Sequence, residues 1–274
     1  MRWLLLVRSR ELGACLVSGA MRQMYEHRFP IVLGKDFAGT VTEIGSDVTD
    51  FAVGDKVFGM VAKQRLTDGG GFGEYLTTAA GAGVAHVPAG LDLAVAGSLG
   101  LAGAVAIAVI DALGPLSGKA ILVSGATGGV GAHVVQLAKA RGAHVIATAA
   151  SGRATEHVLG LGADQAVDYR NDLATQVKQV DSVVHLAGDG ASLASVLVDG
   201  GRIVSAAHLQ LEGHEVTPVM ANPDPAKLSR LAADVAAGRV RVPIARTYPL
   251  DQLATAVSDF AARGVLGKLA IAVA

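Results

Sequence analysis

The second half of the chain alternates between continuous apolar runs and segments with helical spacing. The predicted strands, each containing such an apolar stretch, occupy residues 120–124, 144–149, 165–169, 182–187 and 202–207. In the segments 130–142, 153–163 and 172–180, apolar residues recur three or four positions apart, as on one face of a helix. Strands that are apolar throughout and separated by helices predict a parallel sheet covered on both faces.

The first ninety residues follow a different pattern. Short alternating runs at 39–45 and 55–61, with glycine clusters at 69–73, predict an antiparallel or barrel-like region. The tail, 250–274, has helical spacing followed by glycines and a last apolar run. It predicts a helix, a turn and a final strand.

Two apolar segments could be mistaken for membrane or export signals. Residues 93–110 carry no charge over eighteen positions, which meets the length rule for a membrane helix. Alanine and glycine dominate this segment, Asp92 and Asp111 bracket it, and no aromatic belt or basic flank follows. We therefore expect a helix buried against a sheet and no membrane association. The five apolar residues before Arg8 are too few for a secretory signal.

Composition narrows the functional classes. The 274 residues are 51% apolar and 17% charged, which allows a large core, and the net charge is −1 with no run of lysine or arginine. This balance argues against electrostatic binding of nucleic acid. The single cysteine, Cys15, excludes a disulfide framework within the chain and a zinc site built from several cysteines. It is consistent with a cytoplasmic location.

The stretch VSGATGGVG, 123–131, carries the clearest chemical signal. Gly125, Gly128 and Gly131 are three residues apart, directly after a predicted strand and directly before a predicted helix. The first glycine permits a sharp turn, the second lets a pyrophosphate approach the backbone, and the third lets helix and strand touch. We predict a dinucleotide site; an ordinary turn between strand and helix rarely needs so many glycines. The residues assigned to it are Gly125, Ala126, Thr127, Gly128, Gly129, Val130 and Gly131.

The same glycines also satisfy the pattern of short-chain dehydrogenases through Gly125, Gly129 and Gly131. Those enzymes need a tyrosine with a lysine four residues later for proton transfer. None of the four tyrosines has one; they are Tyr25, Tyr75, Tyr169 and Tyr248. This interpretation is therefore rejected.

The end of the next predicted strand indicates which coenzyme binds. An NAD site places an acid about 20 residues beyond the glycines to hold the ribose 2′-hydroxyl. Here the stretch 147–153 offers Ser151 and Arg153 and no acid. A hydroxyl and a guanidinium would bind a 2′-phosphate, so NADPH is favoured, unless Arg153 merely begins a solvated helix. Tyr169 would flank the adenine or serve as an edge aromatic.

Several collinear stretches resemble one family. They are 29–59, 70–80, the glycine stretch with its flanks, 160–170, 198–206 and 236–271. Together they make the chain similar to the medium-chain dehydrogenases/reductases, in the zinc-free quinone oxidoreductase branch. The resemblance implies an α/β fold with a GroES-like β-rich substrate domain and a doubly wound parallel Rossmann sheet. We expect the substrate domain in 1–92 and 245–274 and the NADP-binding Rossmann domain in 93–244.

The resemblance further implies an oxidoreductase that transfers a hydride from NADPH to a quinone or an α,β-unsaturated carbonyl. Gly188 and Ala206 follow the fourth and fifth predicted strands and are expected beside the nicotinamide half, because ligands bind at the carboxyl ends of parallel strands. Lys268 is expected to reach the cofactor from the tail. Val105 stands where the family has a threonine that approaches the nicotinamide amide.

The resemblance also indicates whether the chain can bind a catalytic metal ion. Where the alcohol dehydrogenase branch has His-Glu after a glycine, this chain has Lys35 and Asp36 after Gly34. A protonated lysine cannot coordinate a cation, so no metal site is expected. Lys35 and Asp36 are candidates for catalysis, with an exposed ion pair or a structural turn as the alternative. No side chain is identified as the proton donor.

Departures from the family leave alternatives open. The segment before 16–24 is shorter than the hairpin and strand of relatives, and Val105 lacks the threonine hydroxyl. A second hypothesis is therefore a catalytically impaired NADPH-binding sensor or regulatory protein, and a third is a misplaced start codon. Because an exposed edge of the Rossmann sheet invites pairing, a homodimer is expected.

Overall fold

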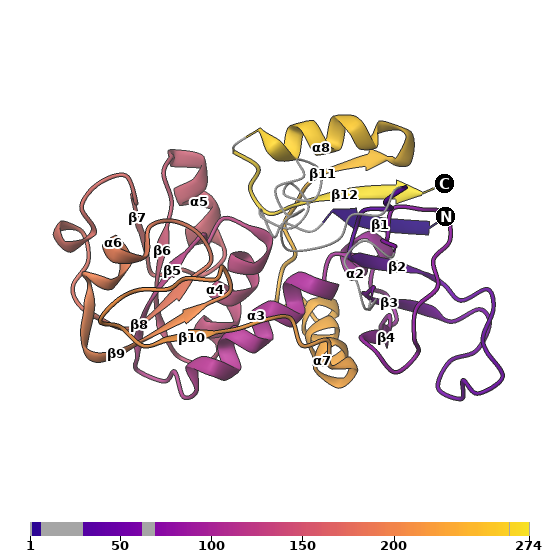
Figure 1. Ribbon diagram of the computed structural model, residues 1–274, viewed down its shortest axis with the longest axis horizontal. Coiled ribbons are helices and arrows are strands. Elements are labelled where there is room, and N and C mark those ends of the chain that lie inside the picture. Colours follow the sequence, from indigo (N-terminus) through magenta and orange to yellow (C-terminus); the bar gives the residue numbers. More distant parts are fainter. Residues whose placement is uncertain (1, 7–29, 62–68, 263, 274) are drawn as a thin grey trace. The chain divides into compact units, whose positions relative to one another are not determined.

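The computed structural model describes residues 2–6, 30–61, 69–262 and 264–273, and Cys15 and the segment 16–24 lie outside them (Figure 1). By packing, the chain forms two compact units: unit 1 comprises 1–104 and 222–274, and unit 2 comprises 105–221. The functional domain boundaries at 92/93 and 244/245 stay a prediction.

Unit 2 contains a six-stranded parallel sheet. Its strands are β5 (Ala120–Ser124), β6 (His144–Thr148), β7 (Gln165–Val167), β8 (Val180–His185), β9 (Leu197–Ser205) and β10 (Val216–Pro218). They lie in the order β10-β9-β8-β5-β6-β7, and every neighbouring pair is parallel. The chain moves outward in both directions from β5, so the order reverses between β5 and β8. This is the doubly wound Rossmann arrangement, which confirms the predicted fold.

Helices pack against this sheet (Figure 1). They are α4 (Gly129–Ala140), α5 (Gly152–Gly160) and the single turn α6 (Gly190–Ala194). The core between the layers consists of branched aliphatic side chains such as Leu122, Val183 and Ile203, all buried. Apolar residues on both faces of the strands therefore produce the two-sided packing that the continuous runs predicted.

Two sequence-based expectations for unit 2 were wrong. The segment 172–180 forms only a 3₁₀ turn, η1 (Leu173–Thr175), because Gln176 donates to the backbone oxygens of Asp168 and Asp172 instead of continuing a helix. The pattern also predicted five strands and missed the three-residue β10. A strand of three residues is too short to show an alternation of apolar and polar positions.

Unit 1 contains the second six-stranded sheet. Its strands are β1 (Arg2–Leu6), β2 (Asp36–Thr40), β3 (Lys56–Met60), β4 (Val84–His86), β11 (Ile244–Pro249) and β12 (Lys268–Val273). The order is β11-β12-β1-β2-β3-β4, antiparallel except for the pair β11 and β12. The antiparallel region predicted for the first ninety residues is confirmed, and it is completed by strands from the tail.

Two further helices follow unit 2 along the chain, and the first of them begins at a side-chain cap. Asp224 accepts from the backbone N–H groups at the start of α7 (Pro225–Ala236), a helix that sequence patterning had not identified. The tail helix, α8 (Leu253–Ala261), follows the 3₁₀ turn η2 (Leu250–Gln252) and precedes β12, as predicted.

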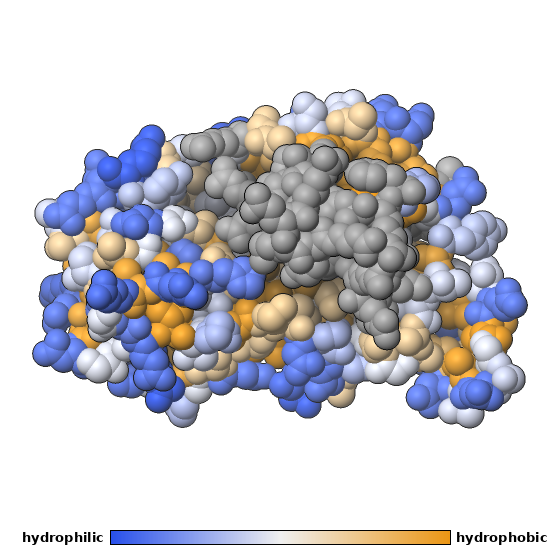
Figure 2. All heavy atoms as spheres, in the orientation of Figure 1, coloured by the Kyte–Doolittle hydropathy of each residue, from blue (hydrophilic) through white to orange (hydrophobic). Residues whose placement is uncertain are grey.

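The uncharged segment 93–110 is not one helix. It forms α2 (Leu93–Gly97), capped by Asp92, and then most of α3 (Gly100–Leu113). Ser98 closes α2 by donating its hydroxyl to Ala94 O at 2.8 Å. In the described ranges, no helix combines the length and apolar character that a membrane crossing requires. Figure 2 shows hydrophilic and hydrophobic residues interspersed over the coloured part of the face it presents.

The contact between β5 and α4 yields a first prediction. A Cβ added at Gly131 would press on Gly125 O and lie 2.6 Å from Ala126 Cα, and backbone cannot yield as a flexible side chain can. Gly131→Ala should therefore lower the free energy of unfolding by about 1–3 kcal/mol. Denaturant unfolding measures this change.

Gly152→Ala is the matched control, since Gly152 also lies at the start of a helix in unit 2 and an added Cβ there meets no atom within 4 Å. It should leave stability within about 1 kcal/mol of the wild type. Equal effects of the two substitutions would contradict the close approach.

Candidate functional site

The glycine stretch forms a tight turn at the carboxyl end of β5. Gly125 has φ +73°, a conformation that side-chain-bearing residues rarely adopt. Gly128 N donates to Gly125 O at 3.1 Å, and Gly125 N donates to Thr148 Oγ1 at 3.2 Å. The turn is thus held from inside and from the neighbouring strand β6.

The start of α4 lacks a side-chain cap, as does the start of α8. The N-cap residue of α4, Gly128, has no side chain that could accept a hydrogen bond from the first turn. By contrast, α5, α6 and α7 begin with Ser151, Asp189 and Asp224, each accepting from a backbone N–H. The first turn of α4 therefore offers N–H groups and a positive dipole end with no side-chain acceptor, as a pyrophosphate requires.

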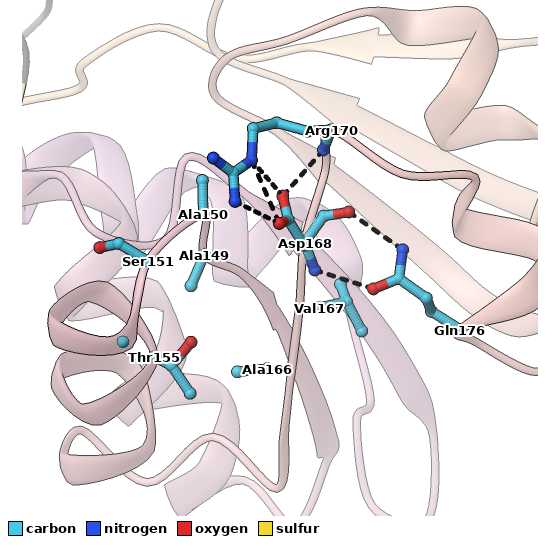
Figure 3. A pocket seen from close by; sticks show the side chains of 10 residues that line it. Ala149, Ala150, Ser151, Thr155, Ala166, Val167, Asp168, Arg170 and Gln176 are labelled. Atoms are coloured by element: carbon cyan, nitrogen blue, oxygen red, sulfur yellow. Dashed lines mark hydrogen bonds and ion pairs between the residues drawn. The ribbon is translucent and has the colours of Figure 1, made fainter.

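A cavity of about 370 Å³ lies at the ends of β6 and β7 (Figure 3). It is lined by Ala149, Ala150, Ser151, Gly152, Thr155, Ala166, Val167, Asp168, Arg170 and Gln176. Ser151, one of the two residues expected to bind a 2′-phosphate, is part of this lining, and its role stays a prediction. Arg153 is exposed and does not line the cavity.

Arg170 is the cation of this cavity, and sequence reasoning missed it. Its Nε and Nη2 atoms donate to the carboxylate of Asp168 at 2.9 and 2.5 Å, as the dashed lines in Figure 3 show. Hydrogen bonds from the Arg170 side chain and backbone lower the pKa of Asp168 to about 2. The signal in the sequence is the Asp-Tyr-Arg stretch directly after β7, one strand beyond the stretch 147–153 on which the prediction rests.

Ser151 can still donate a hydrogen bond to a ligand. Its Oγ accepts from Ala154 N at 3.2 Å, which caps α5 and leaves the hydroxyl hydrogen available. Tyr169 lies in the turn after β7 with 58% of its surface exposed, and it is not part of the cavity lining. Either predicted role of Tyr169 remains a prediction.

The residues expected near the nicotinamide half lie after β8 and β9. Gly188 has φ +98°, and Ala206 N donates to His185 O at 3.1 Å. Both positions are at the same edge of the sheet as the glycine turn, because all six strands are parallel. Val105 lies within α3 and is half-buried.

Asp36 and Lys268 form an ion pair inside unit 1. Both side chains are fully buried, with Lys268 Nζ 3.3 Å from Asp36 Oδ2. The other oxygen, Asp36 Oδ1, accepts from Leu101 N at 2.5 Å, in the first turn of α3. Burial raises the pKa of Asp36 and lowers that of Lys268, against their mutual attraction.

This geometry gives Asp36 and Lys268 a structural role. The pair fastens β2, β12 and the start of α3 to one another, and both carboxylate oxygens are occupied. The neighbouring Lys35 is half-buried and its carbonyl accepts from Val61 N at 2.7 Å. The catalytic role expected for Lys35 and Asp36, and the cofactor contact expected of Lys268, stay predictions.

Comparison with known proteins agrees with this geometry. Residues 4–89 match the family model described as alcohol dehydrogenase GroES-like domain, and residues 161–271 match the one described as zinc-binding dehydrogenase. A solved quinone oxidoreductase from Coxiella burnetii superposes with a TM-score of 0.87 at 26% identity, covering 98% of this chain and 87% of that one. The chain belongs to the medium-chain dehydrogenase/reductase superfamily, in its quinone oxidoreductase-like branch.

Curated relatives match parts of the chain. Quinone-oxidoreductase QR1 of Triphysaria versicolor is 36% identical over 185 residues, which is 63% of this chain and 54% of that protein. The NADPH-dependent alkenal/one oxidoreductase of Arabidopsis thaliana is 32% identical over 254 residues, which is 88% of this chain and 64% of that protein. The chain thus spans about half the length of the first of these relatives and somewhat more of the second.

The buried pair leads to a second prediction. Asp36→Asn removes the partner charge of Lys268 in a dry environment, and Lys268→Met does the same to Asp36. Each should lower the free energy of unfolding by about 3–5 kcal/mol, since one buried charge is left uncompensated. Thermal or denaturant unfolding measures it.

The exposed pair of Arg239 and Asp234, with Arg239 Nη2 2.5 Å from Asp234 Oδ1, provides the control. Arg239→Gln should cost less than about 1 kcal/mol. Losses of similar size at both pairs would show that burial does not set the energy of the Asp36–Lys268 interaction.

Proposed function

We propose that this chain is an NADPH-dependent, zinc-independent oxidoreductase that transfers a hydride to a quinone or an α,β-unsaturated carbonyl. The observation that carries the proposal is the uncapped, glycine-built start of α4 at the point where the strand order reverses. Dinucleotides bind at such a point in open α/β sheets. The names of the relatives supply the substrate class.

The preference for NADPH is supported by the cavity beside β6 and β7. Its lining offers the Ser151 hydroxyl and the Arg170 guanidinium, which suit a 2′-phosphate. The one carboxylate of the lining, Asp168, is bound by Arg170 on both oxygens, at 2.9 and 2.5 Å. Its charge is thereby largely compensated, so Arg170 both removes a repulsion and supplies an attraction.

Zinc independence is supported by the available ligands. The position of the usual histidine ligand is occupied by Lys35, and the following Asp36 has both oxygens engaged. Across 2–6, 30–61, 69–262 and 264–273, no three His, Cys, Asp or Glu side chains gather as a metal would require. The chemistry would then depend on the coenzyme alone.

The coenzyme, when bound, supplies the hydride, and the protein's residues bind and orient it. The α4 N-terminus would hold the pyrophosphate, and Ser151 with Arg170 the 2′-phosphate. Gly188 and Ala206 would leave space for the nicotinamide half, since neither carries a side chain beyond Cβ. The protein's contribution to rate would be alignment of donor and acceptor.

One observation favours a second function, that of an NADPH-binding sensor without turnover. Val105 cannot make the hydrogen bond that a threonine would offer, and Asp36 is sequestered in a structural pair. Dinucleotide binding is expected under both hypotheses, so only turnover separates them.

Coenzyme choice is tested with arginine variants. Arg170→Gln removes the cation and exposes the charge of Asp168, so the Kd for NADPH should rise about tenfold or more. The Kd for NADH should stay the same or fall, because a freed Asp168 can accept from a ribose 2′-hydroxyl. Calorimetric titration of both coenzymes measures this.

Arg153→Gln is the matched comparison, an exposed arginine outside the cavity lining. It should change neither Kd more than about twofold. Loss of NADPH affinity in Arg153→Gln, with none in Arg170→Gln, would assign the phosphate to the sequence-predicted residue instead.

Activity is tested by following NADPH oxidation with a panel of quinones and enones before and after prolonged dialysis against a chelator. We expect turnover with at least one acceptor and rates unchanged by the chelator, because no metal takes part. Binding of NADPH without turnover of any acceptor would favour the sensor. Activity lost on chelation and restored by zinc would contradict the metal-free reaction.

A further inference from the structure

Four adjacent strands of the unit 2 sheet each end on a buried polar side chain. The final residues of β6, β5, β8 and β9 are Thr148, Ser124, His185 and Ser205. Their exposed fractions are 4%, 4%, 4% and 1%. We call these four side chains the terminal polar row. It lies directly beneath the loops that the proposed function assigns to the coenzyme.

Each member of the row holds the backbone of a loop. Thr148 accepts from Gly125 N at 3.2 Å, and Ser124 donates to Ala187 O. Ser205 Oγ accepts from Ala207 N and Leu209 N, both at 3.2 Å, which fixes the turn after β9. The loops after β5, β8 and β9 are therefore shaped by side chains from the strands and not by their own sequence alone.

His185 joins two of these loops. Its Nε2 lies 3.2 Å from Gly188 O in the loop after β8, and its Nδ1 lies 3.0 Å from Ser205 Oγ on β9. The register pairs His185 directly with Ser205, so the imidazole bridges neighbouring strands at their last residues. A serine or threonine at this position would be too short to make both contacts.

The hydrogen bonds around His185 assign one tautomer to its imidazole ring. The Gly188 carbonyl can only accept, so Nε2 must carry the hydrogen and donate it. Ser205 Oγ already accepts two N–H groups, and its own hydrogen is left for Nδ1, which must therefore be an unprotonated acceptor. The neutral Nε2–H tautomer of His185 satisfies every group in this cluster.

We propose that His185 is a positioning residue for the nicotinamide half of the coenzyme. It holds the loop carrying Gly188 and, through Ser205, the turn carrying Ala206 in the geometry that accepts the nicotinamide and its ribose. The inference rests on the proposed function. It predicts that His185 matters for one half of the coenzyme only, because the adenine half would contact β6, at the other end of the row, and β7 beyond it.

Binding of a coenzyme and of its fragment tests this inference. His185→Phe keeps a ring of similar size and removes both hydrogen bonds. Its Kd for NADPH should rise about tenfold, whereas its Kd for adenosine 2′,5′-bisphosphate, which lacks the nicotinamide half, should change less than about twofold. Calorimetry measures both, and thermal unfolding shows that the variant is folded.

Two further variants separate the contacts and serve if His185→Phe does not fold. His185→Asn retains an acceptor near the Nδ1 position, and His185→Gln retains a donor near Nε2. Each should show a smaller rise in the Kd for NADPH than His185→Phe. His144→Gln is the control, since His144 is an exposed histidine at the amino end of β6 in the same sheet, and it should leave both Kd values unchanged.

The outcomes are distinguishable. If all folded His185 variants bind NADPH and the fragment equally weakly, the role of His185 is merely structural. If they bind NADPH as tightly as the wild type, His185 has no role in binding. Either result overturns the inference and leaves the proposed function standing. A wild type that binds neither ligand contradicts the proposed function itself and removes the basis of the inference.

Discussion

The arrangement of the proposed dinucleotide site depends on how closely α4 approaches the end of β5. That approach is possible only because Gly131 has no Cβ, since an added one would lie 2.6 Å from Ala126 Cα. A helix brought so near delivers its first N–H groups to the turn at Gly125 and Gly128. The absence of a side-chain cap then leaves those donors for an anion. One packing constraint thus produces both the strand–helix junction and the N–H donors that the proposed function assigns to the pyrophosphate.

In the cavity at the ends of β6 and β7, the charge of Asp168 is compensated by that of Arg170. A carboxylate near the 2′-position would ordinarily select the coenzyme without phosphate. In the proposed site Asp168 would be such a carboxylate, but Arg170, two residues later, donates short hydrogen bonds to it that lower its pKa to about 2. The pair presents a guanidinium beside a compensated acid. Under the proposed function, coenzyme selectivity would depend on how Asp168 and Arg170 share their charges, which the residue types alone do not reveal.

Sequence reasoning succeeded where local rules decide the outcome. The apolar run 120–124 coincides with β5, because glycine ends it and every residue packs within the sheet. The helix predicted for 172–180 does not form, because the Gln176 side chain makes hydrogen bonds to backbone groups of the preceding loop. Arg170 lines the cavity and Arg153, the cation predicted from the sequence, does not, because strand pairing places the end of β7 beside that of β6. Such pairing is not visible along the chain.

Long-range polar contacts were the least predictable feature and the most consequential. Asp36 and Lys268 are 232 residues apart, yet they share one buried ion pair that also fastens the first turn of α3. His185 and Ser205 likewise meet only because β8 and β9 are neighbours in register. In both clusters a charged or polar group is stable in the interior only if every partner is present, so each cluster specifies one local geometry. Apolar packing determines which layers form, and these buried polar contacts determine the positions of the loops and helix ends that carry function.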